Sequence, residues 1–242
     1  MIQRFIIKNN HKRLTLLFAG WACDDTPFRS CAPTDSDFLV CYDYRDFSFD
    51  DSLLAGYEAY AAFGWSMGVW AGSLVCSRLY REGLFNDHNF HMLTYGGTLF
   101  PMHDELGIPV TIFQGTIDGL TPKTLQKFMR RMCGDSDTYK AFMAVTPRRS
   151  FEENREELQL MADQFRQMLP DDSHATSVSH LTTAYIGERD AIFPPANMER
   201  ACLRLNQPFV KVDAAHYSPV ILRLINRIWD LKPNFKPETI QP

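Results

Sequence analysis

The sequence predicts an α/β fold with a mostly parallel central sheet and flanking helices. Short apolar runs typical of buried strands recur along the chain, and they alternate with segments of helical periodicity. One such run, at residues 60–63, leads into Gly64-Trp65-Ser66-Met67-Gly68 and then into a segment rich in small residues. A strand, a sharp glycine turn and a helix in this order form the unit from which such a sheet is built.

Strands are expected wherever a short apolar run ends at turn residues. The first two runs, separated by a polar turn at residues 9–12, suit a pair of neighbouring strands. The run at residues 37–44 is apolar on both faces at its centre, which is typical of a buried parallel strand. The full set of expected strands is 5–7, 14–18, 37–44, 60–63, 91–97, 182–187 and 208–212.

Helices replace strands in the middle of the chain, and a helical lid is expected there at about residues 115–180 of a single domain spanning 1–242. Thr121 and Pro122 start one helix, and a capping box of Ser150 and Glu153 starts another, which Pro170 ends. Their apolar faces form either the core of the lid or the lining of an acyl-chain site. These faces are Leu125, Phe128, Met129 and Met132, and Leu158, Met161, Ala162, Phe165, Met168 and Leu169. A last helix covers the sheet near residues 220–229, and the proline-rich tail from residue 232 is expected to be loosely attached.

The composition excludes several classes of protein. The chain of 242 residues is 45% hydrophobic and 22% charged, which is ordinary for a globular protein. Its net charge of −4 gives no reason to expect nucleic acid as a partner, and no apolar run approaches the length that spans a membrane. The cysteines are scattered without a Cys-x-x-Cys pair, so reduced, buried thiols and a cytoplasmic protein are expected. They are Cys23, Cys31, Cys41, Cys76, Cys133 and Cys202.

The Gly-x-Ser-x-Gly pattern around Ser66 predicts a nucleophile elbow, provided that an acid and a histidine follow in the right order. Asp190 and His216 each come just after a late predicted strand, so the α/β-hydrolase fold is predicted, with Ser66, Asp190 and His216 as its triad. In this triad the imidazole takes the proton of the serine, and the carboxylate holds the imidazole. Asp118 remains an alternative acid, because it also follows an apolar run after the serine. Asp213 lies too close to His216 in sequence and suits a structural salt bridge.

Two backbone N–H groups are expected to bind the oxyanion of the reaction. The first belongs to Met67, the residue after the nucleophile, and the second to the loop after residue 18. Trp21 is the candidate in that loop because Gly20 lets the backbone approach closely. No set of histidines with metal-ligand spacing is supported by carboxylates or thiols, so no metal and no cofactor are expected.

Several stretches together resemble one family, the BioG-type pimeloyl-[acyl-carrier protein] methyl ester esterases of bacterial biotin synthesis. The stretches are residues 18–21, 63–68, 127–134, 187–190 and 213–217, and the Phe-x-Arg-Arg-Met-Cys-Gly and Gly-Trp pieces are the most specific. The resemblance implies hydrolysis of the methyl ester of a pimeloyl chain carried by acyl carrier protein, releasing methanol. It places Ser66, Asp190 and His216 on the family's catalytic positions and Trp21 and Met67 on its oxyanion positions.

An acidic carrier would need a basic docking surface, and this acidic chain has local candidates for one. They are Lys123, Lys127, Arg130, Arg131, Arg148 and Arg149. The alternative for each is a solvated lid surface. Two other functions remain open: a serine hydrolase or acyltransferase with another ester or thioester substrate, and a binding protein that has lost its activity. Release of methanol, rather than another product, distinguishes the methyl esterase from the first alternative. Failure of a fluorophosphonate to label the protein would favour the second.

Overall fold

A seven-stranded sheet forms the centre of the computed structural model, which describes residues 1–167 and 176–231. The strand order is β1-β3-β2-β4-β5-β6-β7, with β1 antiparallel to β3 and every other neighbouring pair parallel. The predicted, mostly parallel sheet is therefore confirmed. Its strands are β1 (Ile2–Ile7), β2 (Arg13–Phe18), β3 (Asp37–Tyr42), β4 (Ala59–Trp65), β5 (Phe90–Tyr95), β6 (Thr182–Gly187) and β7 (Phe209–Val212).

The pairing of the first two strands differs from the sequence-based expectation. β1 and β2 are both strands, but β3 lies between them. The reason is that β2 is paired along both edges, with β3 on one side and β4 on the other. β1 therefore has only the outer edge of β3 to pair with, and all six residues of β3 are buried as predicted.

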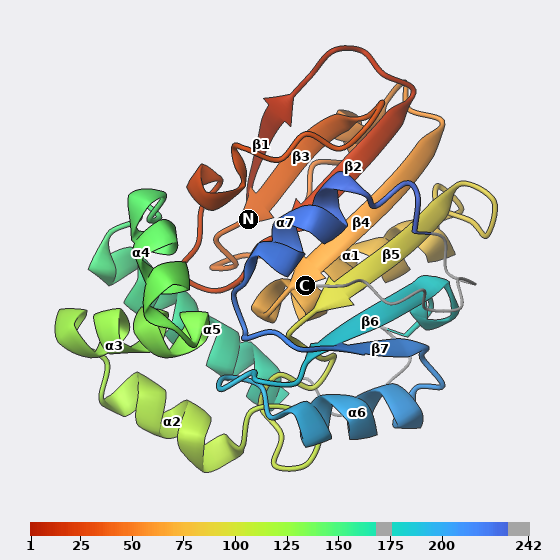
Figure 1. The fold of residues 1–242 in the computed structure, drawn as a ribbon. Helices are drawn as coiled ribbons and strands as arrows, with labels where there is room; N and C mark the ends of the chain where they lie inside the picture. The colour runs from red at the N-terminus through yellow and green to blue at the C-terminus, as the bar shows by residue number, and fades with distance from the viewer. Residues whose placement is uncertain (168–175, 232–242) are drawn as a thin grey trace.

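Helices cover both faces of the sheet (Figure 1). Helix α1 (Met67–Arg81) lies behind the strands in this view, and α7 (Pro219–Asn226) lies in front of them. α6 (Pro195–Arg204) follows β6 and contacts it. Short 3₁₀ turns span Thr26–Phe28, Asp51–Leu54 and Ser179–Leu181. None of the described helices is long and apolar enough to cross a bilayer.

Four helices between β5 and β6 gather beyond the carboxyl ends of the strands (Figure 1). They are α2 (Val110–Asp118), α3 (Pro122–Cys133), α4 (Ser136–Ala144) and α5 (Phe151–Gln167). The predicted helix starts are confirmed, because Thr121 caps α3 and Ser150 and Glu153 exchange backbone–side-chain bonds of 2.9 and 3.2 Å before α5. Met168, Leu169 and Pro170, which were expected to end this helix, lie outside the described residues, as does the tail from residue 232.

Two helices of this group were not predicted. The apolar run at residues 110–113, which resembles a strand in sequence, is the first turn of α2. α4 is short, and Asp135 starts it by accepting hydrogen bonds from the N–H groups of Asp137 and Thr138. The helical segment thus begins at Val110, slightly before the expected boundary, and its action as a lid stays a prediction.

Replacing Gly68 by alanine should strongly destabilise the fold. A Cβ at this position would lie 2.0 Å from the carbonyl oxygen of Phe18, an atom of the rigid β2 backbone. We expect a loss of about 3 kcal/mol or more in unfolding free energy, measured by urea titration. The control is Gly115→Ala in α2, where a Cβ meets nothing within 4 Å and should stabilise by about 0.5–1 kcal/mol. Equal stability of the two variants would contradict this account of the elbow.

Candidate active site

Ser66 occupies the sharp turn between β4 and α1. Its φ of 57° and ψ of −125° are strained for a residue with a side chain, and such strain is typical of functional positions. The turn is possible because Gly68 allows α1 to begin directly against the end of β2. A serine on such a turn is expected to be presented rather than buried, but only 5% of Ser66 is exposed, and side chains of α2, α3 and α5 line the same pocket.

His216 lies beside Ser66 on the loop that follows β7. Its Nε2 is 2.9 Å from the Oγ of Ser66, and its Nδ1 is 2.8 Å from the Oδ2 of Asp190. An ionised carboxylate can only accept, so this arrangement leaves Nε2 free to accept from the serine hydroxyl. His216 is 1% exposed, and the ring of Phe193 stacks on it with centroids 6.0 Å apart.

Asp190 follows β6, and backbone N–H groups as well as His216 hold its carboxylate in place. Its Oδ1 accepts hydrogen bonds from the N–H groups of Ile192 and Phe193 at 2.8 and 2.9 Å. The alternative acid, Asp118, lies exposed at the end of α2, where its Oδ1 accepts from Gln114. Asp213 forms an exposed salt bridge with Arg189 at 2.5 Å, as predicted. The structure therefore brings Asp190 to His216 and leaves the other two carboxylates elsewhere.

The loop that carries His216 is held by two aromatic side chains of the sheet. The indole Nε1 of Trp65 donates to the carbonyl oxygen of His216 at 2.9 Å, and the hydroxyl of Tyr95 donates to that of Ala215 at 2.6 Å. On the lid side, the N–H of Tyr217 donates to the carbonyl of Met132 at 2.9 Å. The histidine is thus tied both to the strand ends and to the end of α3.

Trp21 and Met67, the two predicted oxyanion donors, line the same pocket as Ser66. Gly20 brings the turn close, because a Cβ there would be 3.1 Å from the Cβ of Ser66. Met67 is the first residue of α1, so its N–H has no acceptor within the helix. Among the described residues, the N–H of Trp21 has no hydrogen-bond acceptor either.

The pocket above Ser66 is mainly apolar. It has an empty volume of about 430 Å³, part of it open to solvent. Helices α2, α3 and α5 form most of its wall, and one charged side chain, Arg131, takes part. Its lining is Trp21, Ser66, Met67, Ile108, Ile112, Phe113, Thr116, Phe128, Arg131, Leu158 and Ile192. Of the predicted apolar lid positions that lie within the described residues, only Phe128 and Leu158 reach this pocket, whereas the residues from α2 were missed because α2 was not predicted.

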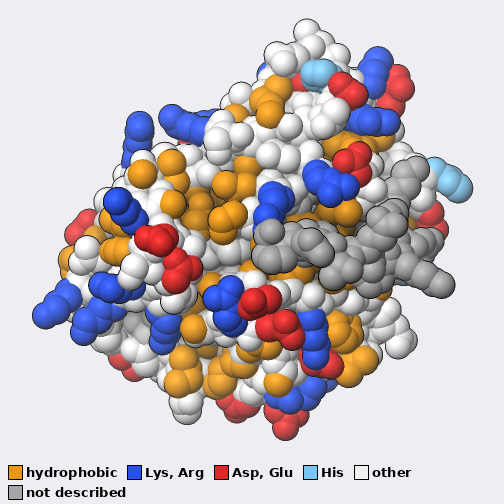
Figure 2. Space-filling view, in the orientation of Figure 1, with side chains coloured by type: hydrophobic (Ala, Val, Ile, Leu, Met, Phe, Trp, Pro, Cys, Tyr) orange, Lys and Arg blue, Asp and Glu red, His pale blue; other side chains and the backbone are white. Residues whose placement is uncertain are grey.

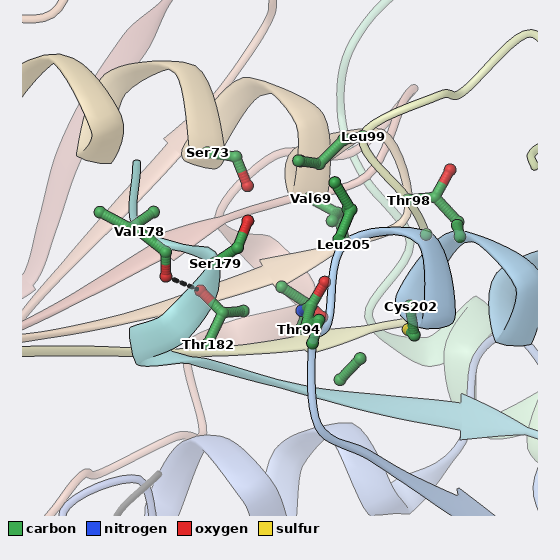
Figure 3. A pocket seen from close by; sticks show the side chains of 14 residues that line it. Val69, Ser73, Thr94, Thr98, Leu99, Val178, Ser179, Thr182, Cys202 and Leu205 are labelled. Carbon is green, nitrogen blue, oxygen red and sulfur yellow. Dashed lines mark hydrogen bonds between the residues drawn. The ribbon is translucent and has the colours of Figure 1, made fainter. Parts of the chain in front are cut away.

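A second hollow contains none of the three residues Ser66, Asp190 and His216 (Figure 3). It is lined by hydroxyl groups of Ser73, Thr94 and Ser179 together with aliphatic side chains. The hydroxyl of Thr182 donates to the carbonyl of Val178 at 2.7 Å, the bond drawn in Figure 3. The lining contains no carboxylate, imidazole or cation, so it offers no acid–base chemistry.

Five of the six predicted docking residues are exposed: Lys123, Lys127, Arg130, Arg131 and Arg148. None of the five forms a salt bridge with a carboxylate of residues 1–167 or 176–231. Figure 2 shows basic side chains gathered at the left of the view, where Figure 1 places α3 and α4.

Arg149 was wrongly assigned to the docking surface. Its side chain is only 6% exposed, and its guanidinium lies 2.5 Å from Glu157 and 3.0 Å from Asp43. Two carboxylates inside the protein draw it inward, so it cannot contact a partner. A sequence signal existed, because Glu157 lies four residues before Met161 on the apolar face of its own helix.

The cysteines offer no competing nucleophile. All six are buried, and burial raises the pKa of each thiol, to about 12 for Cys31, Cys133 and Cys202. A thiol with so high a pKa stays protonated and unreactive near neutral pH. Among residues 1–167 and 176–231, no cluster of three His, Cys, Asp or Glu side chains has the arrangement of a metal site.

Comparison with known proteins identifies similar sequences along most of the chain. The family model described as "Pimeloyl-ACP methyl esterase BioG" matches residues 1–220. A Bacteroides fragilis protein named malonyl-[acyl-carrier protein] O-methyltransferase is 40% identical over 215 residues, which are 88% of this chain. The chain spans only 41% of the length of that relative, so the name describes a much longer protein.

Solved structures agree with the family match. The crystal structure of BioG from Haemophilus influenzae has a TM-score of 0.77 and 31% identity, covering 90% of this chain and 94% of that one. An esterase from Exiguobacterium antarcticum has a TM-score of 0.59 at 10% identity, covering 94% and 93% of the two chains. The second likeness is one of fold alone, and it agrees with the predicted α/β-hydrolase architecture.

Proposed function

Because this chain belongs to the family of BioG-type pimeloyl-[acyl-carrier protein] methyl esterases, we propose that it removes the methyl group from a carrier-bound pimeloyl methyl ester. The products are methanol and a pimeloyl chain that still sits on the carrier. The observation that supports ester hydrolysis is the hydrogen-bonded line Ser66–His216–Asp190, whose serine opens on an apolar pocket.

In the proposed reaction the oxygen of Ser66 attacks the ester carbonyl while Nε2 of His216 takes its proton. Asp190 holds the imidazole in this orientation and stabilises its charged form. The tetrahedral intermediate collapses when the histidine returns the proton to the methoxide, which leaves as methanol. Water, activated by the same histidine, then attacks the acyl–serine ester and restores the free hydroxyl.

The negative charge of the intermediate develops on the former carbonyl oxygen. The N–H groups of Trp21 and Met67 are the proposed donors, because both residues line the pocket beside Ser66 and neither N–H has an acceptor among residues 1–167 and 176–231. Donors that are fixed before the reaction need no rearrangement when the charge appears, which is why such groups contribute strongly to the rate.

The apolar wall suits the methylene chain of a pimeloyl group, and the exposed cations of the lid suit an acidic carrier. Arg131 lies between the apolar pocket and the exposed cations. It lines the pocket, and it belongs to the same helix as Lys123, Lys127 and Arg130. The Bacteroides fragilis relative is also named for an acyl-carrier substrate, which supports a carrier-bound ester. Cytoplasmic location, where such carriers act, is part of this proposal.

Ser66→Ala should abolish hydrolysis and labelling while the protein stays folded. The serine is both the attacking group and the site of the acyl intermediate, so kcat should fall by about 10⁴-fold or more. Methanol release from the carrier ester and labelling by a fluorophosphonate are the measurements. More than a few per cent of wild-type activity in the purified variant would show that another residue is the nucleophile.

Asp190→Asn should lower kcat by roughly 10⁴-fold, because an amide favours the wrong tautomer of the histidine. Asp118→Asn is the matched control and should leave kcat within about twofold, since Asp118 is exposed and accepts a hydrogen bond from Gln114 at the surface. Steady-state kinetics with a small 4-nitrophenyl ester compares the two. A larger loss in the Asp118 variant would refute the assignment of the acid.

Reversing the charges at Lys127 and Arg130 should weaken recognition of the carrier without affecting the chemistry. We expect KM for the carrier ester to rise about tenfold and to become less sensitive to salt, with hydrolysis of a small ester unchanged. Arg223→Glu, at an exposed site on α7, is the control for a charge reversal away from the proposed docking surface. If both substrates lost activity equally, these side chains would be structural, and if neither did, the carrier would dock elsewhere.

A further inference from the structure

We propose that Glu157 is a positioning residue for the reaction: from inside α5 it holds the turn that carries the oxyanion donor Trp21. The inference rests on the proposed function, because Trp21 acts as an oxyanion donor only in the proposed ester hydrolysis. Glu157 lies in neither the triad nor the pocket wall, and its side chain is 0% exposed. It would act through the backbone rather than on the substrate.

Both oxygens of Glu157 accept from backbone N–H groups of the loops at the sheet end. Oε2 accepts from Ala22, directly after Trp21, at 3.4 Å, and Oε1 accepts from Tyr44, just after β3, at 2.8 Å. The Tyr44 hydroxyl in turn donates to the carbonyl oxygen of Ala19 at 2.7 Å. Glu157 and Tyr44 together therefore link both ends of the turn to the loop that follows β3.

Ala22 shows that this turn needs external support. Its φ of 61° is left-handed, which costs an alanine about 1–2 kcal/mol and persists only where the surroundings enforce it. The N–H of Ala22 belongs to the peptide unit that follows Trp21. Holding it against Glu157 fixes the backbone on the far side of the Trp21 Cα and so limits how the Trp21 N–H can turn.

The Trp21 side chain is anchored on the same helix. Its indole Nε1 donates to the carbonyl oxygen of Asn154 at 2.7 Å, one turn before Glu157. Three residues after Trp21, Asp24 accepts from the N–H of Arg148 at 2.8 Å, in the segment that leads into α5. α5 and its leading segment therefore hold the turn at three points: Trp21, Ala22 and Asp24.

The presence of a carboxyl group at position 157, inside the protein, needs an explanation. Burial raises the pKa of Glu157, opposed by Arg149 and by the Tyr44 N–H, so an ionised carboxyl at this place is costly. Apolar residues often replace such buried ion pairs without loss of stability. They cannot accept two backbone hydrogen bonds, however, and Glu157 does so. An apolar residue at this position would therefore leave the N–H groups of Ala22 and Tyr44 without these acceptors and the turn without this support.

The test is Glu157→Gln, compared with Glu156→Gln, the adjacent exposed residue that pairs with Arg45. An amide has one acceptor oxygen where the carboxylate has two, so one of the two N–H groups loses its acceptor. With a small 4-nitrophenyl ester we expect kcat to fall about 10–100-fold with KM unchanged, because loss of an oxyanion donor costs about 10²–10³ and here it is only displaced. The Glu156 variant should stay within about twofold.

Two further measurements distinguish a displaced oxyanion donor from a general disturbance of the active site. The pH–rate profile of Glu157→Gln should keep the wild-type shape, because His216 and Asp190 are untouched. Inhibition by a trifluoromethyl ketone, whose adduct carries an oxyanion, should weaken by the same factor as kcat/KM. A folded variant with kcat within about twofold of wild type, or with an altered pH profile, overturns the proposal.

A second variant covers the case in which Glu157→Gln does not fold. Arg149→Met with Glu157→Leu removes both charges, and Asp43 keeps its other partner, Arg45, at 2.7 Å. We expect this protein to fold and to show the same loss in kcat. Wild-type kcat in it, or failure of both variants to fold, overturns the proposal.

The same experiment distinguishes this proposal from the proposed function. If wild-type protein hydrolyses the small ester but not the carrier ester, the assignment of substrate fails and Glu157 is still tested. If wild-type protein hydrolyses no ester and takes no fluorophosphonate label, both proposals fail together.

Discussion

The backbone at Ser66 is the constraint on which the other parts of the site depend. A φ of 57° there is possible only because α1 starts against the end of β2, with Gly68 in contact with the carbonyl of Phe18. This contact fixes where the chain leaves β2, and so it brings Gly20 and Trp21 to the serine. The nucleophile and the start of the turn that carries Trp21 are therefore positioned by this packing contact, and α5 holds the rest of that turn.

Around this fixed turn, the remaining groups are held from two sides. The strand ends supply Trp65 and Tyr95, whose side chains donate to the backbone of the His216 loop. The helical segment supplies the carbonyl of Met132, which receives the N–H of Tyr217, and the buried carboxylate of Glu157. Because the helices that cover the pocket also hold backbone of the site, movement of these helices would change both access and geometry.

Much of the site could be predicted because its signals are local. A glycine pattern marks Ser66, and Asp190 and His216 lie in the short loops that follow two late strands, β6 and β7. The pairing of β1, the helix α2 and the burial of Arg149 could not be predicted in the same way. Each depends on a partner distant in sequence: β1 pairs with β3, α2 contacts α5, and Arg149 forms an ion pair with Asp43. Glu157 on the apolar face of its helix was one signal for Arg149, but the sequence does not show that Asp43 lies beside the same guanidinium.

The most direct test of the central claim is mass spectrometry of acyl carrier protein loaded with a pimeloyl methyl ester, incubated with the enzyme. The account predicts that the loaded carrier loses the mass of one methylene, as the ester becomes a carboxylic acid, and that the chain stays attached to the carrier. Loss of the whole acyl chain would show thioester cleavage instead. An unchanged mass, with a small ester hydrolysed in parallel, would contradict the claim that the carrier-bound methyl ester is the substrate.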